Sequence, residues 1–236
     1  MRLLTLISIL LYLLFIPLFS NAQHYEIGVS LGTSYYLGEL NPTLPVINSI
    51  QPAGTIFVRK NLNKRYSLKY GGSYMMLKAE DSQSNSKFNK FRNASMSSKL
   101  IELQGVLEFN FFPYQINNRA TFDASPYLFI GLAGFYTDPT VEGSSAGDQS
   151  FSYDATVYSI AIPFGFGVKF DVVKNIGMSV EWGMRKTFTD RLDALKSSYN
   201  NNYQLSQESN KDWYSMIGVS LNYKILTKSD RCPVAR

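Results

Sequence analysis

The fold class is most clearly indicated by the segment Ile176-Gly177-Met178-Ser179-Val180-Glu181-Trp182-Gly183-Met184-Arg185. Its even positions are large and apolar, and its odd positions are small or charged. Successive side chains of a β-strand point to opposite faces, so this period of two predicts a strand with one apolar and one polar face. The alternation recurs at residues 25–32, 101–111, 162–170 and 217–225, and less regularly at 55–60 and 66–76. Residues 125–136 are also interpreted as a strand from their aromatic content, although both faces are rather apolar.

The polar face of these eight segments consists mainly of glycine and serine. Its members include Gly28, Ser30, Gly32, Gly71, Ser73, Gly165, Gly167, Gly177, Ser179, Gly183, Gly218 and Ser220. A soluble β-sandwich or lipocalin-like barrel would instead expose lysine and glutamate on its polar face. Small residues suit a crowded lumen, and the bulky face would then meet lipid. We therefore predict an all-β, eight-stranded antiparallel transmembrane β-barrel, with the soluble barrel as the alternative.

The N-terminus has the pattern of a secretory signal peptide. Met1-Arg2 precedes an apolar run over residues 3–19, and Ser20-Asn21-Ala22 supplies a small-x-small cleavage site. We predict that residues 1–22 are removed on export and that Gln23 begins the mature chain. The alternative is an N-terminal helix that is buried or anchors the chain in a membrane.

The rest of the chain is predicted to form one domain, a barrel over residues 23–226 followed by a tail over 227–236. The predicted connections alternate in length, as they do in outer-membrane barrels. Long polar stretches lie at residues 38–50, 80–98, 137–157 and 188–211, whereas 61–65 and 171–175 are tight turns and 113–123 is intermediate. With both termini in the periplasm, the long connections would be extracellular and the tail periplasmic.

Ten ionisable residues fall on the polar face of the predicted strands. They are Glu26, Arg59, Lys69, Glu102, Glu108, Lys169, Asp171, Glu181, Arg185 and Lys224. Five are acidic and five are basic. The interior of an eight-stranded barrel is only wide enough for side chains, and unpaired ions there are very costly. We therefore predict an internal ion network in a closed, non-conducting barrel. A selective pore, which would favour one sign of charge, is the alternative.

The sequence contains few residues that could form a catalytic or metal site. The chain has one histidine, His24, at the start of the mature protein, where it is remote from any constellation on the long connections. Asp190 and Asp193 do not have the spacing of a known calcium loop. The net charge of +5 is too mild and too scattered to indicate nucleic acid. We predict no catalytic, cofactor or metal site, and outer-membrane lipid as the surrounding medium.

Several motifs resemble the PorG family, outer-membrane barrels of the type IX (Por) secretion system of Bacteroidetes. They include His24-Tyr25-Glu26-Ile27-Gly28 and Tyr36-Leu37-Gly38-Glu39-Leu40 near the start, and Asp212-Trp213-Tyr214 and Cys232 near the end. The resemblance is sharpest from Glu181 to Asp193. It implies a non-enzymatic component that contacts a periplasmic ring formed by the lipoprotein PorK and by PorN. A generic small barrel for adhesion or envelope integrity is the alternative.

Two features are candidate contacts with a partner. The first is Thr187, Phe188, Thr189, Asp190 and Asp193, for which a capped, structured loop base is the competing interpretation. The second is Cys232, the only cysteine. A lone cysteine in an exported protein suggests either an intermolecular disulfide or an idle thiol.

Overall fold

The computed structural model describes most of the predicted barrel. The described residues are 24–37, 49–81, 95–114, 124–145, 149–154, 156–173, 175–189, 192, 199–200, 203–204 and 212–225. The predicted signal peptide and C-terminal tail lie outside these residues. Among the described residues, none belongs to a helix long and apolar enough to cross a membrane.

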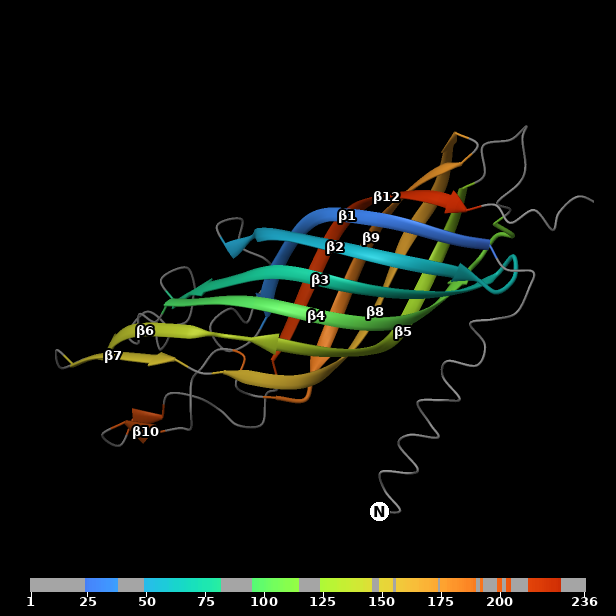
Figure 1. Ribbon diagram of the computed structural model, residues 1–236. Helices are drawn as coiled ribbons and strands as arrows, with labels where there is room; N and C mark the ends of the chain where they lie inside the picture. The colour runs from blue at the N-terminus through green and yellow to red at the C-terminus, as the bar shows by residue number, and fades with distance from the viewer. Residues whose placement is uncertain are drawn as a thin grey trace, which may run out of the picture.

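Eight strands form a closed antiparallel barrel (Figure 1). They are β1 (His24–Leu37), β2 (Gln51–Asn61), β3 (Tyr66–Glu80), β4 (Ser95–Asn110), β5 (Ala124–Thr137), β8 (Val157–Val173), β9 (Ile176–Thr187) and β12 (Trp213–Ile225). Neighbours in sequence pair with each other, β1 pairs with β12, and the β3–β4 pairing completes the closure. The predicted fold class is confirmed.

Four shorter strands lie at the end of the barrel that carries the long connections. β6 (Thr140–Ser145) and β7 (Gln149–Asp154) form a hairpin that projects beyond the barrel (Figure 1). β10 (Tyr199–Asn200) pairs with β11 (Tyr203–Gln204). The predicted loops 80–98 and 137–157 were therefore wrong in part. β4 already begins at Ser95, and β6 pairs with its first three residues because β3 and β4 continue past the rim.

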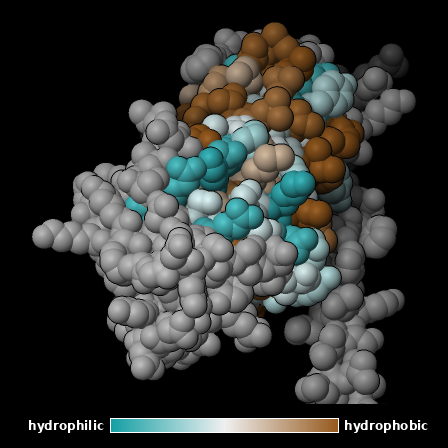
Figure 2. Space-filling view, turned by 90° about the vertical axis from the view of Figure 1, so that its left-hand side faces the viewer, coloured by the Kyte–Doolittle hydropathy of each residue, from teal (hydrophilic) through white to brown (hydrophobic). Residues whose placement is uncertain are grey.

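The barrel is apolar outside and polar inside along most of its height. Large side chains such as Leu31, Ile56 and Leu103 are among the most exposed in the molecule. Small polar side chains point inward, as in Ser73, Ser179 and Ser220, which are buried. Figure 2 shows hydrophobic residues around the outer side of the barrel and hydrophilic residues grouped in the middle. A closed barrel with an apolar exterior is the architecture of outer-membrane proteins, and this protein is a barrel of that class.

The polarity reverses where β3 and β4 extend toward the long connections. There the inner face carries Met75, Leu77 and Leu100, whereas Ser97 and Lys99 are exposed outside. The inner residues join one apolar cluster. Its members are Tyr36, Ala53, Met75, Leu77, Ala79, Met96, Leu100, Ala133, Phe135, Val141, Ala161, Leu192, Tyr214 and Met216. These ends of β3 and β4, the projecting half of the barrel, have the polarity of a water-soluble sheet, whereas Tyr158 and Ile160 keep the outer face of β8 apolar.

Candidate functional site in the barrel lumen

All ten ionisable residues predicted for the lumen lie on the inner face of the barrel. Eight are almost fully buried, and the side chains of Asp171 and Glu181 are 17% and 19% exposed. Each has an opposite charge within 4 Å. The pairs fall into three groups along the barrel axis.

Glu108 is the central carboxylate of the largest group. It accepts hydrogen bonds from Arg59 Nε at 2.8 Å and Lys169 Nζ at 2.5 Å, and Lys69 Nζ lies 3.5 Å away. Arg59 also donates from Nη1 to Glu26 at 2.8 Å. Five strands supply these residues, since β1 provides Glu26, β2 Arg59, β3 Lys69, β4 Glu108 and β8 Lys169. The network therefore crosslinks opposite sides of the lumen.

Neutral polar side chains complete this network. Asn61 and Asn222 donate to the two Glu26 oxygens at 2.8 and 2.5 Å, and Tyr127 donates to Glu181 at 2.7 Å. Sequence reasoning missed all three residues. Asn222 could have been found, because it alternates with Ser220 and Lys224 on the polar face. Tyr127 gave no signal, because both faces of its segment are rather apolar.

Tyr114 lies buried at the end of the lumen where β1 begins and β12 ends. Its backbone N–H donates to the carbonyl of Lys64. This hydrogen bond ties the segment that follows β4 to the turn between β2 and β3. Its hydroxyl donates to Asp171 at 2.7 Å, and Lys224 Nζ pairs with the same carboxylate at 2.5 Å. Burial, the nearby Glu26 carboxylate and the hydrogen bond to Asp171 raise the pKa of the Tyr114 phenol. The phenol therefore remains a hydrogen-bond donor to Asp171.

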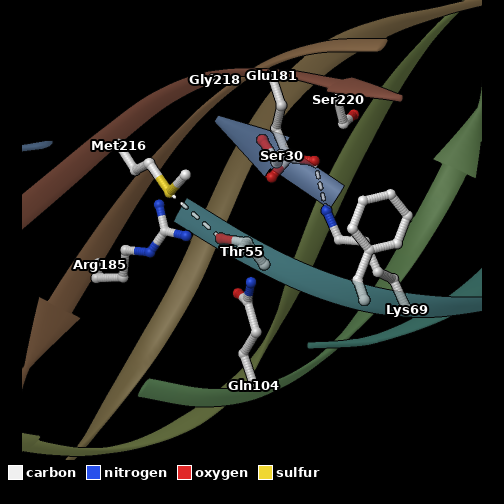
Figure 3. A pocket seen from close by; sticks show the side chains of 10 residues that line it. Ser30, Thr55, Lys69, Gln104, Glu181, Arg185, Met216, Gly218 and Ser220 are labelled. Atoms are coloured by element: carbon white, nitrogen blue, oxygen red, sulfur yellow. Dashed lines mark hydrogen bonds and ion pairs between the residues drawn. The ribbon is translucent and has the colours of Figure 1, made fainter. Parts of the chain in front are cut away.

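Glu102 and Arg185 form the third group, at the level where the apolar half begins. Arg185 Nε lies 3.5 Å from Glu102, and Tyr214 donates to Glu102 at 2.6 Å. A cavity of about 20 Å³ separates this pair from Lys69 and Glu181, and Gln104 points into it (Figure 3). That volume has room for about one water molecule, so a hydrated ion does not fit there.

Aromatic rings fill the space left by inward-facing glycines. A Cβ atom on Gly28 would lie 2.4 Å from the Phe57 ring, and one on Gly167 would lie 2.7 Å from the Tyr127 ring. The lumen is therefore crowded because glycines on one strand admit rings from another. This also explains the apolar inner face of β5, which sequence alone left ambiguous.

At the opposite end, Asp212 holds the connection between β9 and β12 against the apolar cluster. The Asp212 carboxylate accepts hydrogen bonds from the Tyr36 hydroxyl and from the Leu192 backbone N–H. Its carbonyl accepts from the Thr187 hydroxyl at 2.7 Å. Leu192 is fully buried and belongs to the apolar cluster at this end of the lumen.

These contacts involve the segment predicted as a candidate partner contact, for which a structured loop base was the competing interpretation. Thr187 is buried, and its hydroxyl bonds to the carbonyls of Asp212 and Thr189, so it belongs to the loop base. Phe188 is 46% exposed. Asp190, Asp193 and Cys232 lie outside the described residues.

Comparison with known proteins places the chain in a family. The model of a domain of unknown function (DUF6089) matches residues 3–234. The chain belongs to the DUF6089 family. No curated protein sequence matches it significantly.

Several solved structures have the same kind of barrel. Neisserial surface protein A is 11% identical, with a TM-score of 0.48 over 85% of this chain and 97% of that chain. A major outer membrane protein from Thermus thermophilus is 12% identical, with a TM-score of 0.48 over 87% and 100%. Ail, the attachment invasion locus protein of Yersinia pestis, is 12% identical, with a TM-score of 0.45 over 86% and 98%. These likenesses concern the fold alone.

The charged side chains of the lumen bind one another and neighbouring amides. The carboxylates are held by cations and amides, and the described residues contain no group of three or more metal-ligating side chains. Tyr114 and Leu192 occupy the two ends of the lumen. The site can therefore stiffen the barrel and resist the passage of ions.

Proposed function

We propose that this protein is a non-enzymatic, non-conducting structural barrel of the bacterial outer membrane. The observation that supports this most strongly is the lumen, in which ten charges of both signs are paired with each other. A pore needs a continuous polar path with binding weak enough for release. Here the charged side chains engage one another across the barrel.

We further propose that the barrel belongs to the type IX protein secretion machinery and contacts the periplasmic PorK/PorN ring. The resemblance of residues 181–193 and of the two termini to the PorG family supports this role. A rigid barrel without a leak suits the attachment of a periplasmic assembly to the outer membrane. With the termini in the periplasm, the mouth closed by Tyr114 would face the ring.

Crosslinking in intact cell envelopes tests the partner. The tagged, full-length barrel should co-purify with the ring lipoprotein after crosslinking, and an unrelated outer-membrane barrel with the same tag should not. A barrel that is recovered folded and without ring components would contradict the secretion role. A generic role in adhesion or envelope integrity would then be the better account.

Cys232 offers a second, more specific test. Because disulfides form and persist in the oxidising periplasm, we propose a covalent link from Cys232 to a ring component. Non-reducing gels should show a band heavier than the monomer that collapses with reductant and is absent in Cys232→Ser. A wild type that migrates only as monomer rules out this link, while leaving a non-covalent contact open to the crosslinking test.

A further inference from the structure

The lumen is not equally well hydrogen-bonded along its axis. In the largest ion group, both carboxylate oxygens of Glu26 and of Glu108 accept hydrogen bonds. At the level of Glu102, by contrast, three buried atoms find no hydrogen-bond partner among the described residues. They are Glu102 Oε1, Gln104 Oε1 and Arg185 Nε. Buried polar atoms in folded proteins are nearly always hydrogen-bonded, so three exceptions at one level require an explanation.

The cavity of about 20 Å³ lies at this level, and Figure 3 shows the Gln104 side chain pointing into it. Gln104 comes from β4 and is 7% exposed, whereas Arg185 comes from β9 and is 1% exposed. Lys69 and Glu181 line the same cavity and pair with each other at 2.5 Å. The orphaned oxygen of Gln104 thus belongs to a side chain that faces a space with room for about one water molecule.

The hydroxyl groups around the cavity are engaged elsewhere. The Thr55 hydroxyl bonds to that of Ser73 at 2.9 Å, and the Ser220 hydroxyl bonds to that of Ser179. Neither contact reaches Gln104 Oε1, which keeps no donor among the described residues. A donor inside the cavity would satisfy this oxygen.

The charges around the cavity determine which species fits there. An anion would accept hydrogen bonds from Arg185, but it has no proton for Gln104 Oε1 and would lie beside the Glu181 carboxylate. A metal cation would bind Gln104 Oε1, but it would lie beside two cations, Lys69 and Arg185. Water carries no net charge, and it both donates and accepts hydrogen bonds. It is therefore the small species that suits this lining.

We propose that this cavity is a binding site for a single ordered water molecule, which donates to Gln104 Oε1 and accepts from the Arg185 guanidinium. The water links β4 to β9 across the lumen, at the level where the apolar half begins. Buried waters of this kind typically make about three hydrogen bonds and are costly to remove. The inference goes beyond the proposed function and does not depend on it.

Crystals of the purified, folded barrel test the site directly, at a resolution that resolves ordered water. We expect one electron-density peak in the cavity. It should lie within the hydrogen-bond range of about 2.7–3.2 Å from both Gln104 Oε1 and a nitrogen of the Arg185 guanidinium. A cavity without density would overturn the proposal.

Heavier ions distinguish water from a charged ligand. Bromide and rubidium are analogues of the common monovalent anion and cation, and both give an anomalous signal that water lacks. Crystals grown with either salt should show no anomalous peak in the cavity. A bromide peak would assign the cavity to an anion and a rubidium peak to a cation, and either result would overturn the proposal.

Two substitutions check the assigned contact. Gln104→Leu removes the acceptor and should abolish the peak, while heat-modifiable gel mobility shows that the barrel still folds. If that variant does not fold, Gln104→Met makes the same test with a more adaptable side chain. Ser220→Ala is the matched control on the same cavity, because the Ser220 hydroxyl bonds to Ser179, and the peak should remain. A peak that persists without Gln104, or that is lost in Ser220→Ala, would show that Gln104 does not hold the water and would overturn the assignment.

Discussion

The membrane-embedded half and the projecting half of this barrel share strands but have opposite polarity. In the embedded half, Leu103 faces out and Glu108 is buried inside. In the projecting half, Ser97 faces out and Leu100 is buried inside. The change occurs within one step of the register, because Ser73 pairs with Glu102 and Met75 pairs with Leu100.

The difference shows how the solvent selects the side chains of a barrel wall. Where lipid surrounds the wall, apolar residues face out and the enclosed charges must satisfy one another. Where water surrounds the wall, burial of apolar surface inside becomes favourable and forms a conventional core. The two halves should therefore respond differently to equivalent substitutions.

Glu108→Gln should give the largest loss of stability. The substitution keeps the shape of the side chain but leaves Arg59, Lys69 and Lys169 without their shared carboxylate. Breaking a buried ion pair costs about 3–5 kcal/mol. Urea unfolding in lipid vesicles should show that loss, and Glu142→Gln on the exposed β6 should change little. Equal stability of the two variants would mean that the network does not hold the embedded half together.

Leu100→Ala should weaken the projecting half without unfolding the embedded half. Removing a fully buried leucine side chain typically costs about 2–5 kcal/mol, and the volume-conserving Leu100→Met should cost less. Limited proteolysis should cut the long connections faster in Leu100→Ala while heat-modifiable mobility is retained. Global loss of the folded band would show that the two halves unfold as one unit.

Leu103→Arg and Ser97→Arg test where the membrane ends on β4. A cation on the lipid face costs about 2–4 kcal/mol at the bilayer midplane and almost nothing near the interface. Leu103→Arg should therefore lower the unfolding free energy by that amount, and Ser97→Arg should leave it nearly unchanged. A comparable loss at both positions would place Ser97 in lipid and remove the distinction between the halves.

Thr187→Val should have the smallest effect, confined to the connection between β9 and β12. The change removes a hydroxyl that bonds to the carbonyls of Asp212 and Thr189, which costs about 1–2 kcal/mol. Faster proteolysis of this connection, with rescue by Thr187→Ser, is the expected result. If Thr187→Val resists proteolysis as wild type does, the hydroxyl has no role in the loop base.

Much of the fold could be predicted from the sequence, because the alternation of apolar and polar residues shows which side chains face lipid and which face the lumen. Residues 176–185 were sufficient to predict both faces of β9, and the ten ionisable residues were placed on the inner face by period alone. Their pairing could not be predicted, because Arg59 and Glu108 come from strands that are not adjacent in the barrel. Tyr114 and Leu192 were also missed, since each lies in a connection where no periodicity marks an inward side chain.

The change from a polar to an apolar inner face is present in the sequence of β3, but it was not predicted. Met75, Leu77 and Ala79 share a face with Lys69 and Ser73, so the inner face becomes apolar within β3 itself. The start of β4 was predicted as part of the loop over residues 80–98. The apolar inner face of β4 was therefore not matched with the apolar inner face of β3.

The paired charges of the lumen and the buried side chains at its two ends should together block the passage of ions. The most direct test is single-channel recording of the purified, folded wild type in planar bilayers at neutral pH. The account predicts a flat baseline without discrete opening events. Stable, reproducible single-channel currents from the wild type would contradict it.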